Sequence, residues 1–306
     1  NIMNKIVKKI CLLKGGNSFE RDVSLVSAKE CAIAIRQSGY EICEFDFTGD
    51  VMALILHIQE EKPDCVFNAL HGGSGENGNV QSILNFLQIP YTHSGVMASS
   101  IAMHKYISGK LFQSNGIRIP KNSFEKWHDF IKKPDLPCPF VIKPVNSGSS
   151  DGVHIINYAA ELYDISWEYG DMVLVSEYIP GLELTVSMLN DKPLAVTNII
   201  TSTGFYDYKN KYTAGQTFHE IPARIPDDIQ KEALEVAAKA HNLIGCRGVS
   251  RSDFRYNDVT RELFLLEVNT QPGMTPLSLL PEQAKFVGIS FEKLIQYMIE
   301  QSCYDK

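Results

Sequence analysis

The chain has 306 residues, of which 44% are hydrophobic and 21% charged, and its formal net charge is −7. This length predicts two or three domains with a sizeable core. The negative charge argues against nucleic acid or an anionic membrane as the main partner, because both select basic surfaces.

Two further features of the composition bear on the compartment. No apolar run approaches the about 18 residues of a membrane span, and residues 1–5 lack the features of a secretory signal. The seven cysteines have no CxxC spacing, and most lie among apolar residues, as at Cys11, Cys43, Cys65 and Cys138. This usage favours reduced thiols over a disulfide framework or a zinc site, so we expect a cytoplasmic protein.

Strands and helices alternate through the first third of the chain. The pattern predicts them in turn at residues 5–13, 22–37, 41–47, 51–59 and 64–70. Such alternation indicates a parallel sheet, whose ligands bind at the carboxyl ends of the strands. Glu20 follows the first strand and His71 the third, each in a glycine-rich turn. Both are therefore site candidates. The His71 loop can equally be an ordinary loop, although its glycines argue against a packed core histidine.

The next segment predicts a phosphate site. Residues 90–95 are typical of a linker, which places a domain boundary near residue 93, and a single helix is expected at 99–115. The strand at 140–143 ends in Lys143, and the small residues of 146–152 follow it. Backbone amides among small residues can approach phosphate oxygens while Lys143 supplies charge. A flexible hairpin with a surface lysine is the alternative.

Three later stretches have simpler readings. Residues 172–183 form a strand entering a bend, which suits an adenine slot as well as a core strand. Residues 204–215 place aromatic residues and lysines between glycines, as in a mobile lid. Residues 227–244 and 290–301 are expected to be helices, the second beginning with a serine cap.

The stretch 265–275 predicts a metal site. On a strand, alternate side chains share a face, so Glu267 and Asn269 project together. Asp253, in the apolar run 248–254, could supply a third oxygen ligand. Such a cluster suits a hard cation such as Mg²⁺. The alternative is a solvated edge strand with unrelated carboxylates.

The order and spacing of these motifs resemble the ATP-grasp superfamily and, within it, the D-alanine–D-alanine ligases. The matching stretches are 15–24, 69–72, 91–99, 205–208 and 265–275. The resemblance implies an α/β fold with a Rossmann-like parallel sheet domain (1–93) and two α+β ATP-grasp domains (94–176 and 177–306) that sandwich ATP. It implies ligation of two D-alanines through an acyl phosphate for peptidoglycan synthesis, with ATP as substrate and two Mg²⁺ or Mn²⁺ ions. A homodimer is expected.

The resemblance also implies a role for individual residues. For catalysis and substrate binding it implies Glu20, His71, Ser149, Tyr212, Arg251, Gly273, Ser278 and Leu279. For ATP it implies Lys105, Lys143, Ser150, Glu177, Ile179, Glu183 and Lys211. For metal it implies Asp253, Glu267 and Asn269. Glu20 would hold the first D-alanine's ammonium group, and Arg251 and the Gly273 N–H would stabilise the tetrahedral intermediate.

Three residues depart from the family pattern. Ser176 stands where an acid is usual, which predicts weaker nucleotide binding. Asp151 stands where a valine is usual, and its charge would be repelled by a triphosphate unless it points away or approaches the metal. His104 replaces the usual aspartate before Lys105.

Two other functions are compatible with parts of the sequence. An ATP-grasp ligase could use D-lactate or D-serine as acceptor. The resemblance implies a chain of hydrogen bonds from Tyr212 to Ser149 to Glu20, which favours an amine acceptor over the hydroxyl of D-lactate. A nucleotide-binding regulator without catalysis would lack a metal ligand or the arginine, and none is missing.

Overall fold

The computed structural model describes residues 7–134, 136–201 and 217–305. The first sheet is parallel, as predicted, with strand order β2-β1-β3. Its elements are β1 (Lys9–Gly15), α1 (Arg21–Gln37), β2 (Glu41–Phe47), α2 (Val51–Glu61), β3 (Cys65–Asn68), η1 (Gly73–Gly75) and α3 (Asn79–Phe86). Alternate residues of β1 face two cores. Ile10 and Leu12 pack with α1, whereas Cys11 and Leu13 pack with α2 and α3.

Two short helices lead away from this sheet, namely α4 (Val96–Met103) and α5 (Lys105–Ser114). The prediction of one helix at 99–115 was therefore wrong. The chain bends at His104, where the Lys105 N–H donates to the carbonyl of Val145 at 3.0 Å instead of continuing the helix. His104 Nδ1 accepts a hydrogen bond from the Ile107 N–H at 3.4 Å. His104 thus caps α5, a position at which aspartate is also favoured.

The segment predicted as a linker is part of the core. Tyr91, Thr92 and Ser94 are almost fully buried. Tyr91 bridges Val66 of β3 and Cys303 near the other end of the chain. The proline-to-glycine pattern of 90–95 did not reveal this burial, because the partners are distant in sequence.

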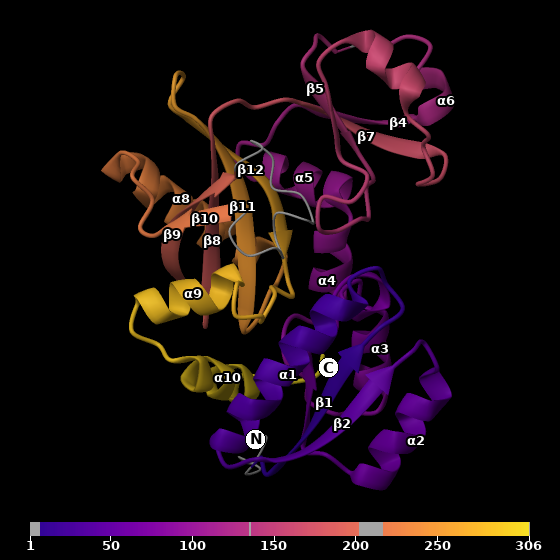
Figure 1. Ribbon diagram of the computed structural model, residues 1–306, viewed down its shortest axis with the longest axis vertical. Helices are drawn as coiled ribbons and strands as arrows, with labels where there is room; N and C mark the ends of the chain where they lie inside the picture. The colour runs from indigo at the N-terminus through magenta and orange to yellow at the C-terminus, as the bar shows by residue number, and fades with distance from the viewer. Residues whose placement is uncertain (1–6, 135, 202–216, 306) are drawn as a thin grey trace.

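The second sheet is antiparallel, with order β4-β7-β5-β6. Its elements are β4 (Asn122–Lys126), α6 (Trp127–Phe130), β5 (Phe140–Lys143), β6 (His154–Ile156), η2 (Ala159–Asp164) and β7 (Met172–Glu177). Figure 1 shows this unit farthest from the first sheet.

The third sheet is also antiparallel, with order β10-β9-β8-β11-β12. The remaining elements are β8 (Leu182–Leu189), β9 (Lys192–Thr201), β10 (Thr217–Glu220), α8 (Asp227–Leu243), β11 (Val249–Asn257), β12 (Glu262–Asn269), α9 (Leu279–Phe286) and α10 (Phe291–Glu300). α8 and α5 cover one core of this sheet.

The last helix returns to the first sheet. α10 begins after Ser290, whose Oγ accepts from the Lys293 N–H at 3.3 Å, which confirms the predicted cap. Its residues Leu294 and Ile295 share a core with Ile10 and Leu12 of β1. In Figure 1, α10 lies beside α1, and the C-terminal end lies close to the first sheet. The domain ranges 1–93, 94–176 and 177–306 remain a proposal.

All seven cysteines are free thiols, and Cys138 is exposed although its apolar neighbours suggested burial. Among the described helices, none combines the length and apolar character that crossing a membrane requires.

Candidate active site

Two cavities adjoin each other and share Lys105, Ser147, Gly148 and Glu267 in their walls. Their empty volumes, which include space that is open to solvent, are about 850 and 1000 Å³. The first is lined by Glu20, His71, Ser149, Arg251, Asn269, Gly273, Ser278 and Leu279, and the second by Lys143, Ser150, Glu177, Ile179, Glu183 and Asp253. The structure thus brings together every predicted site residue that it describes. Lys211, Tyr212 and the rest of the predicted lid at 204–215 lie outside the described residues.

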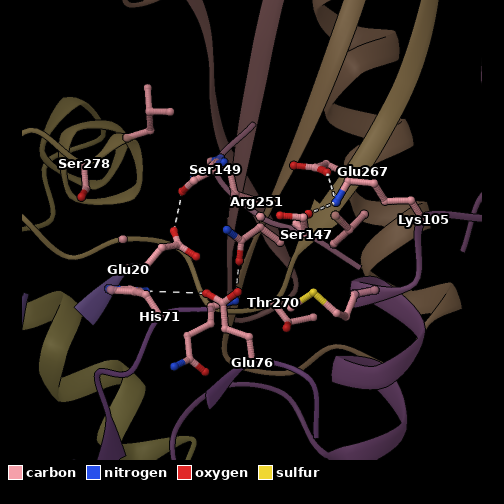
Figure 2. A pocket seen from close by; sticks show the side chains of 18 of the residues that line it. Glu20, His71, Glu76, Lys105, Ser147, Ser149, Arg251, Glu267, Thr270 and Ser278 are labelled. Atoms are coloured by element: carbon pink, nitrogen blue, oxygen red, sulfur yellow. Dashed lines mark hydrogen bonds and ion pairs between the residues drawn. The ribbon is translucent and has the colours of Figure 1, made fainter. Parts of the chain in front are cut away.

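Glu20 and Ser149 meet across the first cavity. Glu20 precedes α1 and is only 5% exposed. The Ser149 hydroxyl donates a hydrogen bond to its carboxylate, as Figure 2 shows. Ser149 and Ser150 have φ values of 48° and 60°. Non-glycine residues held there cost about 1–3 kcal/mol each and cluster at functional sites, so the surrounding contacts must hold this loop against Glu20.

His71 is packed, contrary to the expectation drawn from its glycine-rich loop. It is 4% exposed, and its Nε2 lies 2.9 Å from Ser27 Oγ of α1. Its Nδ1 lies 3.7 Å from Glu76 Oε1 (Figure 2). The neighbours come from α1 and from beyond η1 rather than from the loop. Glu76 lines the same cavity but was missed, since nothing in its own sequence context marks it.

The ends of β11 and β12 carry the predicted metal ligands and arginine. Asp253 is opposite Glu267 in the strand register, and Arg251 is opposite Asn269. Asp253 accepts from Arg251 Nε at 2.8 Å and Nη2 at 2.7 Å, and from Thr185 Oγ1 at 2.6 Å. The cross-strand pairing therefore places these groups side by side, with Glu267 and Asn269 alternating along β12.

Two lysines set the charge of the shared wall. Lys105 Nζ lies 3.1 Å from Glu267 Oε2 and donates to the Ser147 carbonyl (Figure 2). Lys143 ends β5. Loss of water around its amino group, together with the nearby Lys105, lowers the pKa of Lys143 to about 8, although Glu267 opposes this shift. Lys143 therefore loses its proton at a lower pH than an exposed lysine does.

The second cavity has an arginine that sequence analysis missed. Arg255 donates to the Ile179 carbonyl at 3.0 Å and to the Gly181 carbonyl at 2.8 Å. Its Nη1 lies 3.7 Å from Glu183 Oε2. Arg255 therefore fixes the bend after β7. The alternation of Arg251, Asp253 and Arg255 along β11 was the available signal.

Asp151, one of the family departures, is held by two neutral partners. Its carboxylate accepts from Ser147 Oγ at 3.1 Å and from the Tyr169 hydroxyl at 2.9 Å. Burial and the bond to Asp151 raise the pKa of Tyr169, so the phenol stays protonated as the donor. Within the described parts of the chain, Asp151 is thus bound by a serine and a tyrosine hydroxyl. Ser176, another departure, is buried in the wall of this cavity.

The loop after β12 closes the first cavity. A Cβ on Gly273 would lie 2.7 Å from Ser278 Oγ, so a larger residue there would displace the Ser278 hydroxyl. Ser278 precedes α9, whose first residue is Leu279. Gln271, also missed, ties this loop to the first sheet, because its Oε1 accepts from Asn68 Nδ2 at 3.1 Å. That contact joins residues far apart in sequence, which explains why no local pattern showed it.

A parallel sheet unit beside two antiparallel sheets, with a cavity of lysines and carboxylates where they meet, defines the protein as an ATP-grasp enzyme. Family models described as the N-terminus and C-terminus of D-ala D-ala ligase match residues 50–94 and 111–300. The D-alanine–D-alanine ligase of Acidiphilium cryptum is 48% identical over 97% of this chain and 99% of its own. This chain belongs to the D-alanine–D-alanine ligase family.

Solved structures agree with this placement. The D-alanine–D-alanine ligase of Bacillus anthracis complexed with ATP is 30% identical, with a TM-score of 0.82 and coverage of 97% of both chains. The VanG D-Ala:D-Ser ligase of Enterococcus faecalis is 29% identical, with a TM-score of 0.80, over 96% of this chain and 98% of its own. The shared fold covers almost the whole chain.

Proposed function

We propose that the protein joins two D-alanine molecules with ATP and releases D-alanyl-D-alanine, ADP and phosphate. One observation carries the proposal. The predicted nucleotide residues line one cavity, the predicted amino-acid residues line the next, and Lys105 and Glu267 belong to both walls. A phosphoryl group leaving ATP in the second cavity would reach a carboxylate held in the first at this shared wall.

The first D-alanine would bind through its ammonium group to Glu20. Ser149 orients that carboxylate by donating to it, and burial strengthens the attraction. The substrate carboxylate would then attack the terminal phosphate of ATP, which forms an acyl phosphate. Two anions approach each other in this step, so Lys105 and Lys143 would offset the repulsion.

Asp253, Glu267 and Asn269 would hold magnesium or manganese, and we infer two ions. Two carboxylates and an amide oxygen are hard donors that suit these ions, and the strand register brings the carboxylates opposite each other. When bound, the ions would neutralise charge on the phosphates. In the structure, Arg251 and Lys105 contact the same carboxylates.

The second D-alanine would attack the acyl phosphate with its amine. Arg251 and the Gly273 N–H, both in the wall of the first cavity, would stabilise the oxyanion of the tetrahedral intermediate, which then expels phosphate. The acceptor's carboxylate would bind at Ser278 and Leu279, where the first turn of α9 offers free N–H groups. His71 would form part of the wall around the two amino-acid substrates. In the nucleotide cavity, the Ile179 N–H and Glu177 would meet adenine, Glu183 the ribose, and Ser150 the phosphates.

We further infer that the product serves peptidoglycan synthesis in the cytoplasm, that the three domain ranges given above hold, and that the protein is a homodimer. We also propose that Lys211 contacts the phosphates of ATP and that Tyr212 forms a hydrogen bond with Ser149. The Ser149–Glu20 bond supports the described part of that chain.

The proposed reaction predicts both products and acceptor choice. ATP turnover with Mg²⁺ should depend on D-alanine and yield ADP and phosphate, because an amine that displaces an acyl phosphate releases phosphate. With equal D-alanine, D-serine and D-lactate near neutral pH, mass spectrometry should show mainly D-alanyl-D-alanine. Release of AMP and pyrophosphate would refute an acyl phosphate. If D-alanyl-D-serine or D-alanyl-D-lactate is the main product, the preferred acceptor is not D-alanine. The VanG D-Ala:D-Ser ligase is a structural relative named for such an acceptor.

The lowered pKa of Lys143 predicts how nucleotide binding depends on pH. With a pKa of about 8, the amino group is mostly charged at pH 7 and mostly neutral at pH 9. Phosphates bind the charged form, so the Kd for ATP should rise as pH increases through 8, by up to about tenfold per pH unit. Calorimetry in buffers of different ionisation enthalpy should also show proton uptake near pH 8.

Lys143→Arg is the matched control, because arginine stays charged at both pH values. Its Kd for ATP should vary less between pH 7 and 9 than that of the wild type. If both proteins show the same pH dependence, another group causes it.

A further inference from the structure

A cluster of two thiols and an imidazole lies beneath α2, away from both cavities. Cys11 of β1 and Cys43 of β2 are direct partners in the parallel register. His57, on α2, completes the group. One ligand atom from each of the three lies within 4.8 Å of the others, and among the residues that the structure describes no other His, Cys, Asp and Glu side chains form such a group. None of the three lines the active-site cavities.

The imidazole in this cluster has one nitrogen that makes no hydrogen bond with the described residues. His57 Nε2 is shielded from solvent and has no hydrogen-bond partner among the described residues. Its ring packs against the Phe45 ring, with 4.9 Å between the ring centroids, and this contact holds the imidazole in place. Buried polar atoms without a partner are uncommon, and each needs an explanation such as an absent ion.

The two thiols are unlike each other. Cys11 is fully buried, whereas Cys43 is half-buried and its thiol donates to the Ile10 carbonyl at a long 3.6 Å. A hydrogen bond from Cys11 lowers the pKa of Cys43, although burial of the thiol opposes this shift. The same pairing and burial raise the pKa of Cys11. The cluster therefore places two sulfurs and one imidazole nitrogen within reach of one ion, and cysteine binds metals in its thiolate form.

We propose that Cys11, Cys43 and His57 bind one thiophilic metal ion of the zinc class. A tetrahedral zinc ion, with bonds of about 2.3 Å to sulfur and 2.0 Å to nitrogen, holds its ligand atoms about 3.5–3.8 Å apart. The atoms lie within 4.8 Å of one another, so they need to approach by about 1.3 Å at most, which side-chain rotations provide. Two sulfurs and an imidazole select such an ion over Mg²⁺, which prefers oxygen.

The cysteine spacing in the sequence argued against a zinc site because no CxxC is present. The structure forms the pair through strand register instead, with Cys11 and Cys43 side by side on β1 and β2. On binding, the Cys11 thiol loses its proton to solvent, and a water molecule takes the fourth position on the half-buried Cys43 side. The ion would join β1, β2 and α2, and so stabilise the first sheet.

Cobalt(II) titration of the full-length protein tests the site. The protein is kept reduced with a phosphine, and excess Mg²⁺ occupies the carboxylates of the active site. One equivalent of Co²⁺ should produce an intense near-ultraviolet thiolate-to-cobalt band, and Zn²⁺ should displace it. Zn²⁺ should also raise the Tm of the wild type, since a ligand that binds only the folded state stabilises it.

Three variants separate this site from other thiols. Cys43→Ser should lose the band and the Tm shift, and His57→Asn should weaken Co²⁺ binding at least about tenfold. Cys138→Ser, which removes an exposed cysteine outside the cluster, should bind as the wild type does. Circular dichroism checks that the variants are folded, and Cys43 and His57 are only half-buried. Absence of the band in the wild type, or an unchanged band in folded Cys43→Ser or His57→Asn, overturns the proposal.

Discussion

Glu267→Gln is expected to lower kcat at least about a hundredfold, the largest loss among the single substitutions considered. Glu267 lies in the wall common to both cavities and faces Asp253 across the strand pair. Glutamine keeps the size of the side chain but removes one formal charge from the proposed metal site. Lys105, 3.1 Å away, would also lose its carboxylate partner.

Steady-state kinetics across a Mg²⁺ titration measure this loss, and Glu262→Gln is the matched control. Glu262 lies on the same strand, but its side chain is 44% exposed and contacts only Arg118 among the ion pairs of the described residues, at 3.8 Å. Its replacement should leave kcat near that of the wild type. Near-normal turnover of Glu267→Gln at any Mg²⁺ concentration would show that β12 does not carry the metal site.

Arg251→Lys is expected to lower the rate of ligation by about 10²–10³, the loss typical of a missing oxyanion donor. Lysine keeps the positive charge near Asp253 but cannot make the two parallel hydrogen bonds that Arg251 makes at 2.8 and 2.7 Å. The tetrahedral intermediate forms only when the amine attacks. Phosphoryl transfer from ATP to the first D-alanine should therefore be affected much less.

Positional isotope exchange in ATP measures the first step by itself, and dipeptide formation measures both steps. In Arg251→Lys, the exchange should persist while ligation falls. An equal fall in both rates would indicate that Arg251 acts by positioning Asp253, its partner across the buried ion pair. Thermal unfolding of the variant controls for a loss of stability, because both side chains are largely buried.

Local patterns predicted the first sheet and the placement of several candidate site residues, for a physical reason. Glu20 lies in the turn that follows β1, and Glu267 and Asn269 alternate along β12, so the strand pattern alone places them at a strand end or on one strand face. The bend at His104 was missed because the Lys105 N–H is taken by Val145, which no helical pattern reveals. Contacts between distant segments decide such features.

The residues missed in the site share this dependence on distant partners. Gln271 acts through Asn68, and Arg255 through the carbonyls of Ile179 and Gly181. The lack of CxxC spacing likewise hid the neighbouring thiols of Cys11 and Cys43, which meet only when β1 and β2 pair. Sequence reasoning found residues whose neighbours are local, and it failed where tertiary contacts supply the neighbours.

The return of α10 to the first sheet constrains how the chain can fold during synthesis. The core that contains Ile10 and Leu12 also contains Leu294 and Ile295, from opposite ends of the sequence. The Arg247 side chain, which lies over the Tyr91 ring and pairs with Asp305, adds a second closure of the same kind. While the chain is still emerging from a ribosome, β1 and α1 lack part of their cover and expose apolar surface. The sheet that contains β1 is thus completed by α10, which is made after both antiparallel sheets, and this ties folding of the ATP-grasp sheets and the first sheet into one late, cooperative step.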